Sequence, residues 1–180
     1  MTSIGRLSGH ARQRLSGDPR VVRTRALLKQ ALLGLLREND WGEITVASLC
    51  RRAGVARSSF YEHFTVKAEV LDDLFVEKLA EIEISADAGP RLATLDWLVD
   101  HANEAPDFFA GAMAGRRGDA LAPRFVAALA RRLEQELSAR GIPEAMPKAA
   151  FVIGGAVAYL LATKDADPGT QLQRLAARLL

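Results

Sequence analysis

Residues 45–64 read TVASLCRRAGVARSSFYEHF, and this stretch decides the fold. Thr45 is a residue type that caps helix N-termini, and a short helix with an apolar inner side follows it. Gly54 suits the left-handed conformation that ends such a helix, and a second short helix begins just after it. Phe60 and Phe64 are four residues apart, so both rings lie on one side of that second helix. The stretch therefore predicts a helix-turn-helix.

The second of these helices carries polar residues that suit DNA. Arg57 has a guanidinium that bonds a guanine edge bidentately or a phosphate, and the two serines after it reach bases or backbone at short range. Two polar-tipped rings follow at the next turn, and two further residues stand at helix N-termini, where free N–H groups favour phosphate. We predict DNA contacts from Thr45, Arg57, Ser58, Ser59, Tyr61, His63 and Lys67.

Charge is distributed unevenly along the chain. Residues 1–70 hold 12 Lys and Arg against 6 Asp and Glu, a net charge of +6, whereas residues 71–180 hold 12 against 16, a net charge of −4. Arg20, Arg23 and Arg25 add positive charge just ahead of the helix-turn-helix. The split favours contact of only the N-terminal part with a polyanion, the alternative being chance clustering of solvated charges.

Helical patterns run through the rest of the 180 residues. The first helix is expected to begin at Asp18-Pro19, an N-cap followed by proline, and to bury an apolar stripe that includes Val22, Leu27 and Leu33. No stretch alternates with period two for long enough to form a convincing strand, so the predicted fold is all-α with about nine helices. The expected helices span about 19–38, 46–53, 56–63, 66–82, 92–103, 106–114, 121–140, 143–164 and 169–179.

The sequence resembles the DNA-binding signature of the tetracycline-repressor (TetR) family. The likeness rests on the Thr-Val start of 45–64, the Ala-Gly-Val turn, the run Phe-Tyr-x-His-Phe, and Lys67 three residues later. The close match covers about residues 20–75. Cys50 departs from the family, which usually has alanine there; we expect it to pack as a small hydrophobic residue, with a redox sensor as the alternative.

The resemblance implies a homodimeric transcriptional regulator, usually a repressor that a small-molecule ligand releases from a palindromic operator. It implies an N-terminal three-helix DNA-binding domain and a C-terminal helical domain that binds ligand and dimerises. We therefore divide the chain into a flexible basic arm (1–18), a helix-turn-helix DNA-binding domain (19–66) and a ligand-binding and dimerisation domain (67–180). The implied partners are double-stranded operator DNA, a second copy of the chain and an unknown effector.

Two helices near the end of the chain are the candidate dimer interface. The segment 151–163 is apolar nearly all round, so it must be buried, and its small residues permit close approach of another helix. The last helix adds an edge of leucines. The alternative is that both helices only close the protomer's own core. The candidate interface residues are Phe151, Gly154, Gly155, Ala158, Leu161, Ala162, Leu172, Leu175 and Leu179.

Large apolar residues on the middle helices are the candidate ligand pocket. His101 and Asp100 either orient a ligand or form a solvated surface pair. The alternative for the whole group is ordinary core packing. The candidate pocket residues are Trp97, His101, Phe108, Phe109, Met113 and Phe125.

The sequence argues against several other classes of protein. It has no Glu-x-x-His pair and no His-Glu-x-x-His helix, and its three histidines are scattered, so we expect no enzyme activity, metal or cofactor. The longest apolar run, 149–163, is shorter than the roughly 18 residues that span a bilayer, and no secretory signal is recognisable. We expect a cytoplasmic protein without a membrane partner. The alternative function is a helical protein-interaction module that does not bind DNA.

Overall fold

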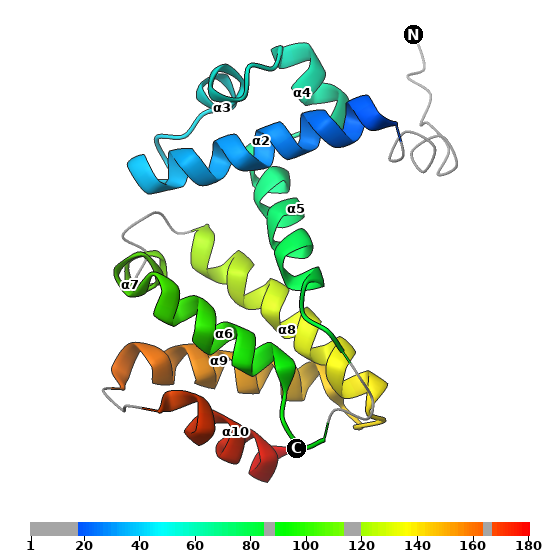
Figure 1. Ribbon diagram of the computed structural model, residues 1–180, viewed down its shortest axis with the longest axis vertical. Helices are drawn as coiled ribbons and strands as arrows, with labels where there is room; N and C mark the ends of the chain where they lie inside the picture. The colour runs from blue at the N-terminus through cyan, green and yellow to red at the C-terminus, as the bar shows by residue number, and fades with distance from the viewer. Residues whose placement is uncertain (1–17, 85–88, 114–119, 164–166) are drawn as a thin grey trace, which may run out of the picture. The chain divides into compact units, whose positions relative to one another are not determined.

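The computed structural model describes residues 18–84, 89–113, 120–163 and 167–180, and within them the fold is all-α (Figure 1). The described residues form nine helices and no strand, so the predicted fold class is confirmed. The helices are α2 (Pro19–Glu38), α3 (Val46–Ala53), α4 (Arg57–His63), α5 (Lys67–Ala80), α6 (Ala93–Glu104), α7 (Pro106–Met113), α8 (Leu121–Ala139), α9 (Ala145–Ala162) and α10 (Pro168–Leu179).

The chain divides into two compact units. The N-terminal unit comprises Met1–Asn39 and Glu43–Asp73, and the C-terminal unit comprises Asp40–Gly42 and Leu74–Leu180. The division falls inside α5, after the expected boundary between residues 66 and 67. The functional boundary between a DNA-binding and an effector domain stays a prediction, and the expected basic arm lies almost wholly outside the described residues.

Helix α2 is the base of the N-terminal unit, and α3 and α4 pack on it and on each other (Figure 1). Asp18 caps it as expected, accepting a hydrogen bond from Arg20 N at 2.8 Å, and proline follows the cap. Most of the predicted apolar stripe is wrong, because Val22 is 54%, Leu27 36% and Leu33 37% exposed. The buried residues are Leu28, Ala31, Leu32, Leu35 and Leu36.

This error has a physical cause in the leucine pairs of α2. Adjacent leucines at 27–28, 32–33 and 35–36 allow two apolar stripes at helical spacing, about one residue apart. The side that carries Arg25 turns inward, because its guanidinium bonds the Asp73 carboxylate on α5. The pairing of Arg25 with Asp73 therefore favours burial of one leucine stripe over the other. Helical periodicity alone cannot reveal this choice, because the two residues are far apart in sequence.

The antiparallel neighbours α8 and α9 form the centre of the C-terminal unit. Helix α6 packs against both, and α10 packs against α6 and α9. Each contributes buried side chains at spacings of three or four, so one side of each helix is in the core. The main contributors are Phe125, Leu129, Leu133 and Leu137 on α8 and Ala149, Val152, Ile153 and Ala156 on α9.

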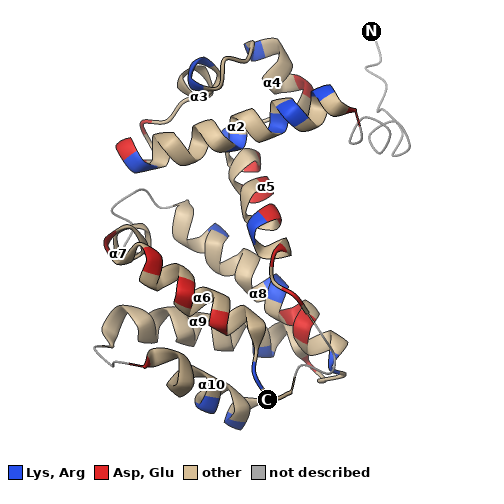
Figure 2. Cartoon of the chain, viewed as in Figure 1, with Lys and Arg blue, Asp and Glu red and all other residues tan. Residues whose placement is uncertain are grey.

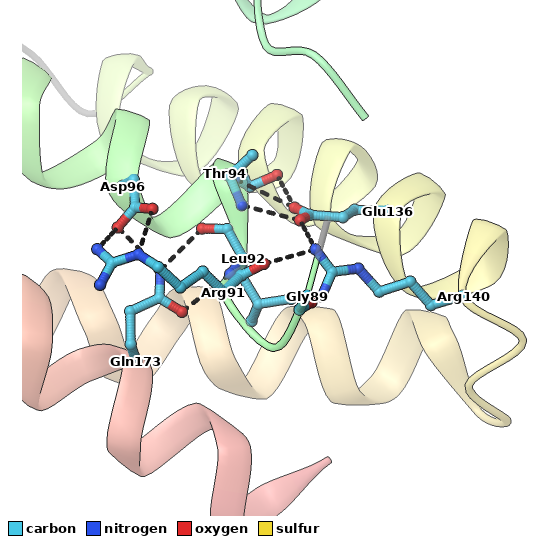
Figure 3. Close-up of polar contacts among 9 residues, drawn as sticks. Gly89, Arg91, Leu92, Thr94, Asp96, Glu136, Arg140 and Gln173 are labelled. Atoms are coloured by element: carbon cyan, nitrogen blue, oxygen red, sulfur yellow. Dashed lines mark hydrogen bonds and ion pairs between the residues drawn. The ribbon is translucent and has the colours of Figure 1, made fainter. Parts of the chain in front are cut away.

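Glu136, a fully buried carboxylate on α8, caps the first turn of α6 (Figure 3). The N-cap residue Leu92 offers no side-chain acceptor. Glu136 instead accepts hydrogen bonds from Ala93 N at 2.8 Å, Thr94 N at 3.1 Å and Thr94 Oγ1 at 2.8 Å. A carboxylate at a helix N-terminus satisfies free N–H groups and interacts favourably with the helix dipole. The contact fixes α6 against α8.

Gln173 and Arg140 complete this polar cluster (Figure 3). Gln173 on α10 accepts from Leu92 N and donates to Leu92 O, both at 2.9 Å. Arg140 donates to Glu136 at 2.6 Å and to Gly89 O at 2.9 Å. The network ties the chain segment before α6 to both α8 and α10, and its buried polar groups are largely satisfied within the protein.

Among the described helices, α9 alone has the length and composition of a membrane-crossing helix, with a mean hydropathy of 1.6 over 18 residues. We expected no segment of this length, because the unbroken apolar run 149–163 is shorter than 18 residues. That expectation is wrong by length and composition, because the helix also includes Pro147 and Lys148. One side of α9 packs on α8 in the core. Its other side is exposed in the protomer and is the side predicted to contact a second copy.

Candidate nucleic-acid interface

Helix α3 begins with a capping box. Ser48 N donates to Thr45 Oγ1 at 3.0 Å, and Thr45 N donates to Ser48 Oγ at 2.9 Å. This reciprocal pair satisfies two N–H groups at the start of the helix. The Thr45 side chain is exposed, as a DNA contact requires, but its hydroxyl oxygen already accepts a hydrogen bond within the protein.

The turn between α3 and α4 depends on the conformation of Gly54. Its φ of 65° and ψ of 31° lie in the left-handed region, and a Cβ there would meet no atom within 4 Å. Backbone dihedral angles, rather than lack of space, therefore favour glycine. Val55 N then donates to Cys50 O at 3.0 Å, which satisfies a carbonyl in the last turn of α3.

Helix α4 has one buried and one exposed side. Phe60 is fully buried and Phe64 is 4% exposed, with ring centroids 5.8 Å apart. Arg57 and Ser58 are exposed, and Tyr61 is 60% exposed although the centroid of its ring lies 5.2 Å from that of Phe60. The structure thus leaves these three predicted contact residues exposed. The other two on α4, Ser59 and His63, are half-buried.

Lys67, at the first position of α5, is half-buried rather than fully open to solvent. Its Nζ donates to Ile44 O at 2.5 Å, which joins the start of α5 to the residue before the α3 cap. Burial lowers the pKa of Lys67. Its ammonium therefore has a structural partner inside the protein, and its phosphate contact stays a prediction.

Arg25 joins three helices of the N-terminal unit. Its Nη2 lies 2.7 Å from Asp73 Oδ1, and its guanidinium stands 4.9 Å from the centroid of the Phe64 ring at the end of α4. Lys29 Nζ lies 3.5 Å from the same carboxylate. Arg25 was expected to add free positive charge, but Asp73 largely offsets it. The cluster instead fixes the end of α4 relative to α2 and α5.

Arg52 holds α3 to α2. Its guanidinium makes a bidentate pair with Glu38, at 2.6 and 2.8 Å, and lies over Gly34, where a Cβ would come within 3.1 Å of Nη2. The hydrogen bond from Arg52 holds the pKa of Glu38 below its ordinary value. Both side chains are exposed, so the pair contributes more to orientation than to stability.

Exposed cations remain on all three helices that carry the motif (Figure 2). They occur near the start and end of α2, in the last turn of α3 and at the first residue of α4, so each of these helices presents positive charge to solvent. On α2, α3 and α4, the exposed arginines without a carboxylate partner among the described residues are Arg20, Arg23, Arg37, Arg51 and Arg57.

Cys50 is buried, with 3% of its surface exposed. Burial raises the pKa of its thiol, and the charge of Arg57 opposes the shift to a smaller extent. A reactive sensor thiol needs a lowered pKa and solvent access. The environment therefore favours the expected role as a small hydrophobic residue.

The predicted pocket residues gather around one phenylalanine of the C-terminal unit. Trp97 stacks on His101 with centroids 4.7 Å apart, and both rings adjoin Phe125. Phe109 lies 6.3 Å from Phe125, and Phe75, which the pocket prediction left out, lies 5.5 Å from it. Phe108 and Met113 are half-buried, and Met113 packs against the core that includes Phe125. Ligand binding by this aromatic cluster stays a prediction.

His101 and Asp100 do not form the solvated pair considered above. Asp100 is exposed, whereas His101 is half-buried between Trp97 and Phe125. Burial lowers the pKa of His101, with smaller opposing and reinforcing effects from Glu104 and Lys78. The lowered pKa favours the neutral form of the imidazole, which therefore presents an uncharged ring to Trp97 and Phe125.

Eight of the nine candidate interface residues are exposed in the protomer. Phe151 is 68%, Leu161 43%, Leu175 39% and Leu179 51% exposed. A Cβ added at Gly154 or Gly155 would meet no atom within 4 Å, so no contact inside the protomer requires these glycines. The ninth residue, Leu172, is 5% exposed and belongs to the core of its own unit.

A groove of 160 Å³ runs between α9 and α10 on this surface. Its walls combine predicted interface residues with Tyr159, which the prediction left out. The residues that shape it are Phe151, Gly155, Tyr159, Leu172, Leu175 and Leu179. The surface thus offers both a protruding ring, at Phe151, and an apolar hollow beside it.

Comparison of sequences places the helix-turn-helix among known regulators. Residues 28–74 match the family model described as "Bacterial regulatory proteins, tetR family". A 66-residue segment is 39% identical to the HTH-type transcriptional regulator YxbF of Bacillus subtilis (strain 168). That match covers 36% of this chain and 17% of YxbF. The match to the family model therefore lies in the N-terminal part of the chain.

Comparison of structures extends the likeness in fold to most of the chain. A TetR transcriptional regulator from Rhodococcus sp. RHA1 aligns with a TM-score of 0.59 at 16% identity, over 90% of this chain and 96% of that protein. The TetR family repressor AlkX from Dietzia sp. strain DQ12-45-1b, described as implicated in biodegradation of n-alkanes, aligns with a TM-score of 0.50 at 16% identity, over 86% and 92%. At this identity the alignments establish the fold alone.

Proposed function

We propose that this chain is a cytoplasmic repressor of the tetR family of bacterial regulatory proteins, because residues 28–74 match the model of that family. In this proposal a homodimer binds a palindromic DNA operator and leaves it when a small molecule binds. The observation that carries the proposal is the two-sided character of α4. Phe60 and Phe64 are buried and hold α4 in the N-terminal unit, while Arg57, Ser58 and Tyr61 stay exposed to solvent.

The exposed side of α4 suits the major groove of DNA, which is about 12 Å wide and admits one helix. Arg57 bonds a guanine edge in this account, and Ser58 bonds a base or the backbone. Tyr61 and His63 contact phosphate oxygens, with Thr45 and Lys67 at the adjacent helix starts. Arg52 and Arg25 keep the helices in register through Glu38, Asp73 and Phe64, rather than by touching DNA.

Dimerisation through α9 and α10 supports recognition of a palindrome, because two-fold symmetry then presents two copies of α4. A two-fold interface needs a surface that complements itself. Phe151 and the groove over Gly155 lie on the same exposed surface, so the ring of each protomer has a hollow to enter on the other. The empty space at Gly154 and Gly155 favours close approach of a partner helix.

The effector is proposed to bind at the aromatic cluster of the C-terminal unit. Trp97, His101 and Phe125 offer flat apolar surface and one neutral imidazole. Release from the operator requires that the effector bind the DNA-free conformation more tightly than the DNA-bound one. A shift from 1% to 99% release needs about 10⁴-fold preference.

Selection of bound sequences from genomic fragments tests the proposal. The native protein should enrich a palindromic site, and its affinity for that site should fall steeply with salt as counterions are released. Enrichment of no DNA at low salt would reject it in favour of a helical protein-interaction module. An operator site without two-fold symmetry would reject the dimeric part alone.

A further inference from the structure

Glu62 is the remaining exposed residue of α4, and the DNA-contact prediction did not include it. It is exposed and stands one helical turn beyond Ser58, next to Tyr61. Within the described residues it makes no hydrogen bond or ion pair. Figure 2 shows charge of both signs on this short helix.

A carboxylate at this position opposes DNA binding unless a hydrogen-bond donor meets it. The first 70 residues carry a net charge of +6, and DNA carries one negative charge per about 1.7 Å of axis. An exposed Glu62 is repelled by every phosphate that the surrounding arginines attract. The floor of the major groove offers it a donor, because carboxylates accept hydrogen bonds from the N4 amino group of cytosine.

We propose that Glu62 is a specificity-determining residue that selects a cytosine in each half of the operator by accepting a hydrogen bond from its N4 amino group. The inference rests on the proposed function, since it requires α4 to enter the major groove. It adds a base contact of opposite polarity to that of Arg57, which donates to guanine.

The spacing of the two residues along α4 sets the register of these contacts. Arg57 and Glu62 are five residues apart, which corresponds to about 7.5 Å along the helix axis. Successive bases are separated by about 3.4 Å along a DNA strand. The two side chains therefore address different base pairs, and the half-site contains both a guanine selected by Arg57 and a separate cytosine selected by Glu62.

Base preference of the native protein and two Glu62 variants tests this proposal. Glu62→Ala should lose about tenfold discrimination for cytosine at one position of each half-site, while other positions keep their preference. Glu62→Gln should shift that same position toward adenine, because an amide bonds adenine N6 and N7. Glu43→Gln, at another exposed carboxylate of the N-terminal unit, is the matched charge control and should leave every preference unchanged.

The outcomes separate this inference from the function on which it rests. If both Glu62 variants keep all base preferences and only bind more tightly on every sequence, as Glu43→Gln does, Glu62 is a repulsive charge and the inference is overturned. A native protein that selects no DNA would reject the proposed function itself. Circular dichroism of each variant confirms that α4 remains folded.

Discussion

The helices α4 and α9 each leave one side exposed, and the two exposed sides have opposite chemistry. On α4 the exposed residues are charged or polar, as at Arg57 and Glu62, and water solvates them readily. On α9 they are apolar or small, as at Phe151 and Gly154, so exposure is costly. The first surface suits a hydrated polyanion that binds and leaves. The second suits a partner that stays bound. In the proposed function, dimerisation and DNA binding therefore use separate surfaces.

A charge on the apolar surface should have the largest effect. Phe151→Glu places a carboxylate on the exposed side of α9, where a protomer tolerates it but a dimer would bury it. We expect monomers in sedimentation at micromolar concentration. Operator affinity should fall about 100-fold or more, because the two half-sites are no longer bound together.

Ala127→Glu is the matched control for that variant, since it adds the same charge at an exposed position of α8. It should remain dimeric and keep its operator affinity. A Phe151→Glu protein that stays dimeric would remove α9 from the interface and leave its apolar side unexplained.

Loss of the Arg57 guanidinium should have the next largest effect. Arg57→Ala should lower affinity for the selected site by about 5- to 150-fold, which corresponds to about 1–3 kcal/mol for a bidentate base contact, and relax preference at one base pair. Arg51→Ala, which removes an exposed arginine from α3, should weaken binding equally on all sequences. Fluorescence titrations on matched and mismatched sites measure both, and identical profiles for the two variants would contradict base reading by Arg57.

A smaller, two-signed effect is expected at Gly154. In a monomeric Phe151→Glu background, Gly154→Ala should raise the free energy of unfolding by about 0.5–1 kcal/mol, because alanine favours helix and its Cβ meets no atom. In the native background the same methyl group should weaken the dimer several-fold. Denaturant titration measures the change in the free energy of unfolding, and sedimentation measures the change in dimer affinity. A gain in stability without any change in dimer affinity would place Gly154 outside the interface.

The smallest effect concerns pH and His101. Burial lowers the pKa of His101, so its imidazole binds a proton less readily in the folded state than in the unfolded state, where the pKa is near 6.5. The part of the free energy of unfolding that depends on neutral His101 is therefore fully present above about pH 6.5, and it decreases as the pH falls below that value. His101→Phe should flatten this part of the profile of melting temperature between pH 5 and 8. An unchanged slope in the variant would assign the acid sensitivity to other groups.

The N-terminal unit was largely predictable because its signals are local. The cap at Thr45, the turn at Gly54 and the anchors Phe60 and Phe64 lie within 20 contiguous residues, and each structural role follows from residue type and spacing. The side of α2 that is buried was not predictable in this way. Its choice depends on Asp73, which is distant in sequence and bonds Arg25.

The C-terminal unit was predictable in its helices but not in its polar contacts. The breakers between helices are prolines, glycines and aspartates, so the expected helix limits lie close to those observed. The cap of α6 is different, because Thr94, Glu136 and Gln173 come from three helices with no common spacing. Lys67 shows the same limit at the site, since its motif position suggests phosphate while the fold supplies Ile44 O.

The most direct test of the account is the spacing of the two half-sites that one protein dimer protects. Footprinting on the selected operator, combined with the stoichiometry of the complex, measures it. We expect two protomers on one palindrome, with half-site centres about 34–36 Å apart, or a multiple of that distance, because the two copies of α4 must enter major grooves on the same side of the duplex. Protection of a single half-site by one protomer would contradict the account.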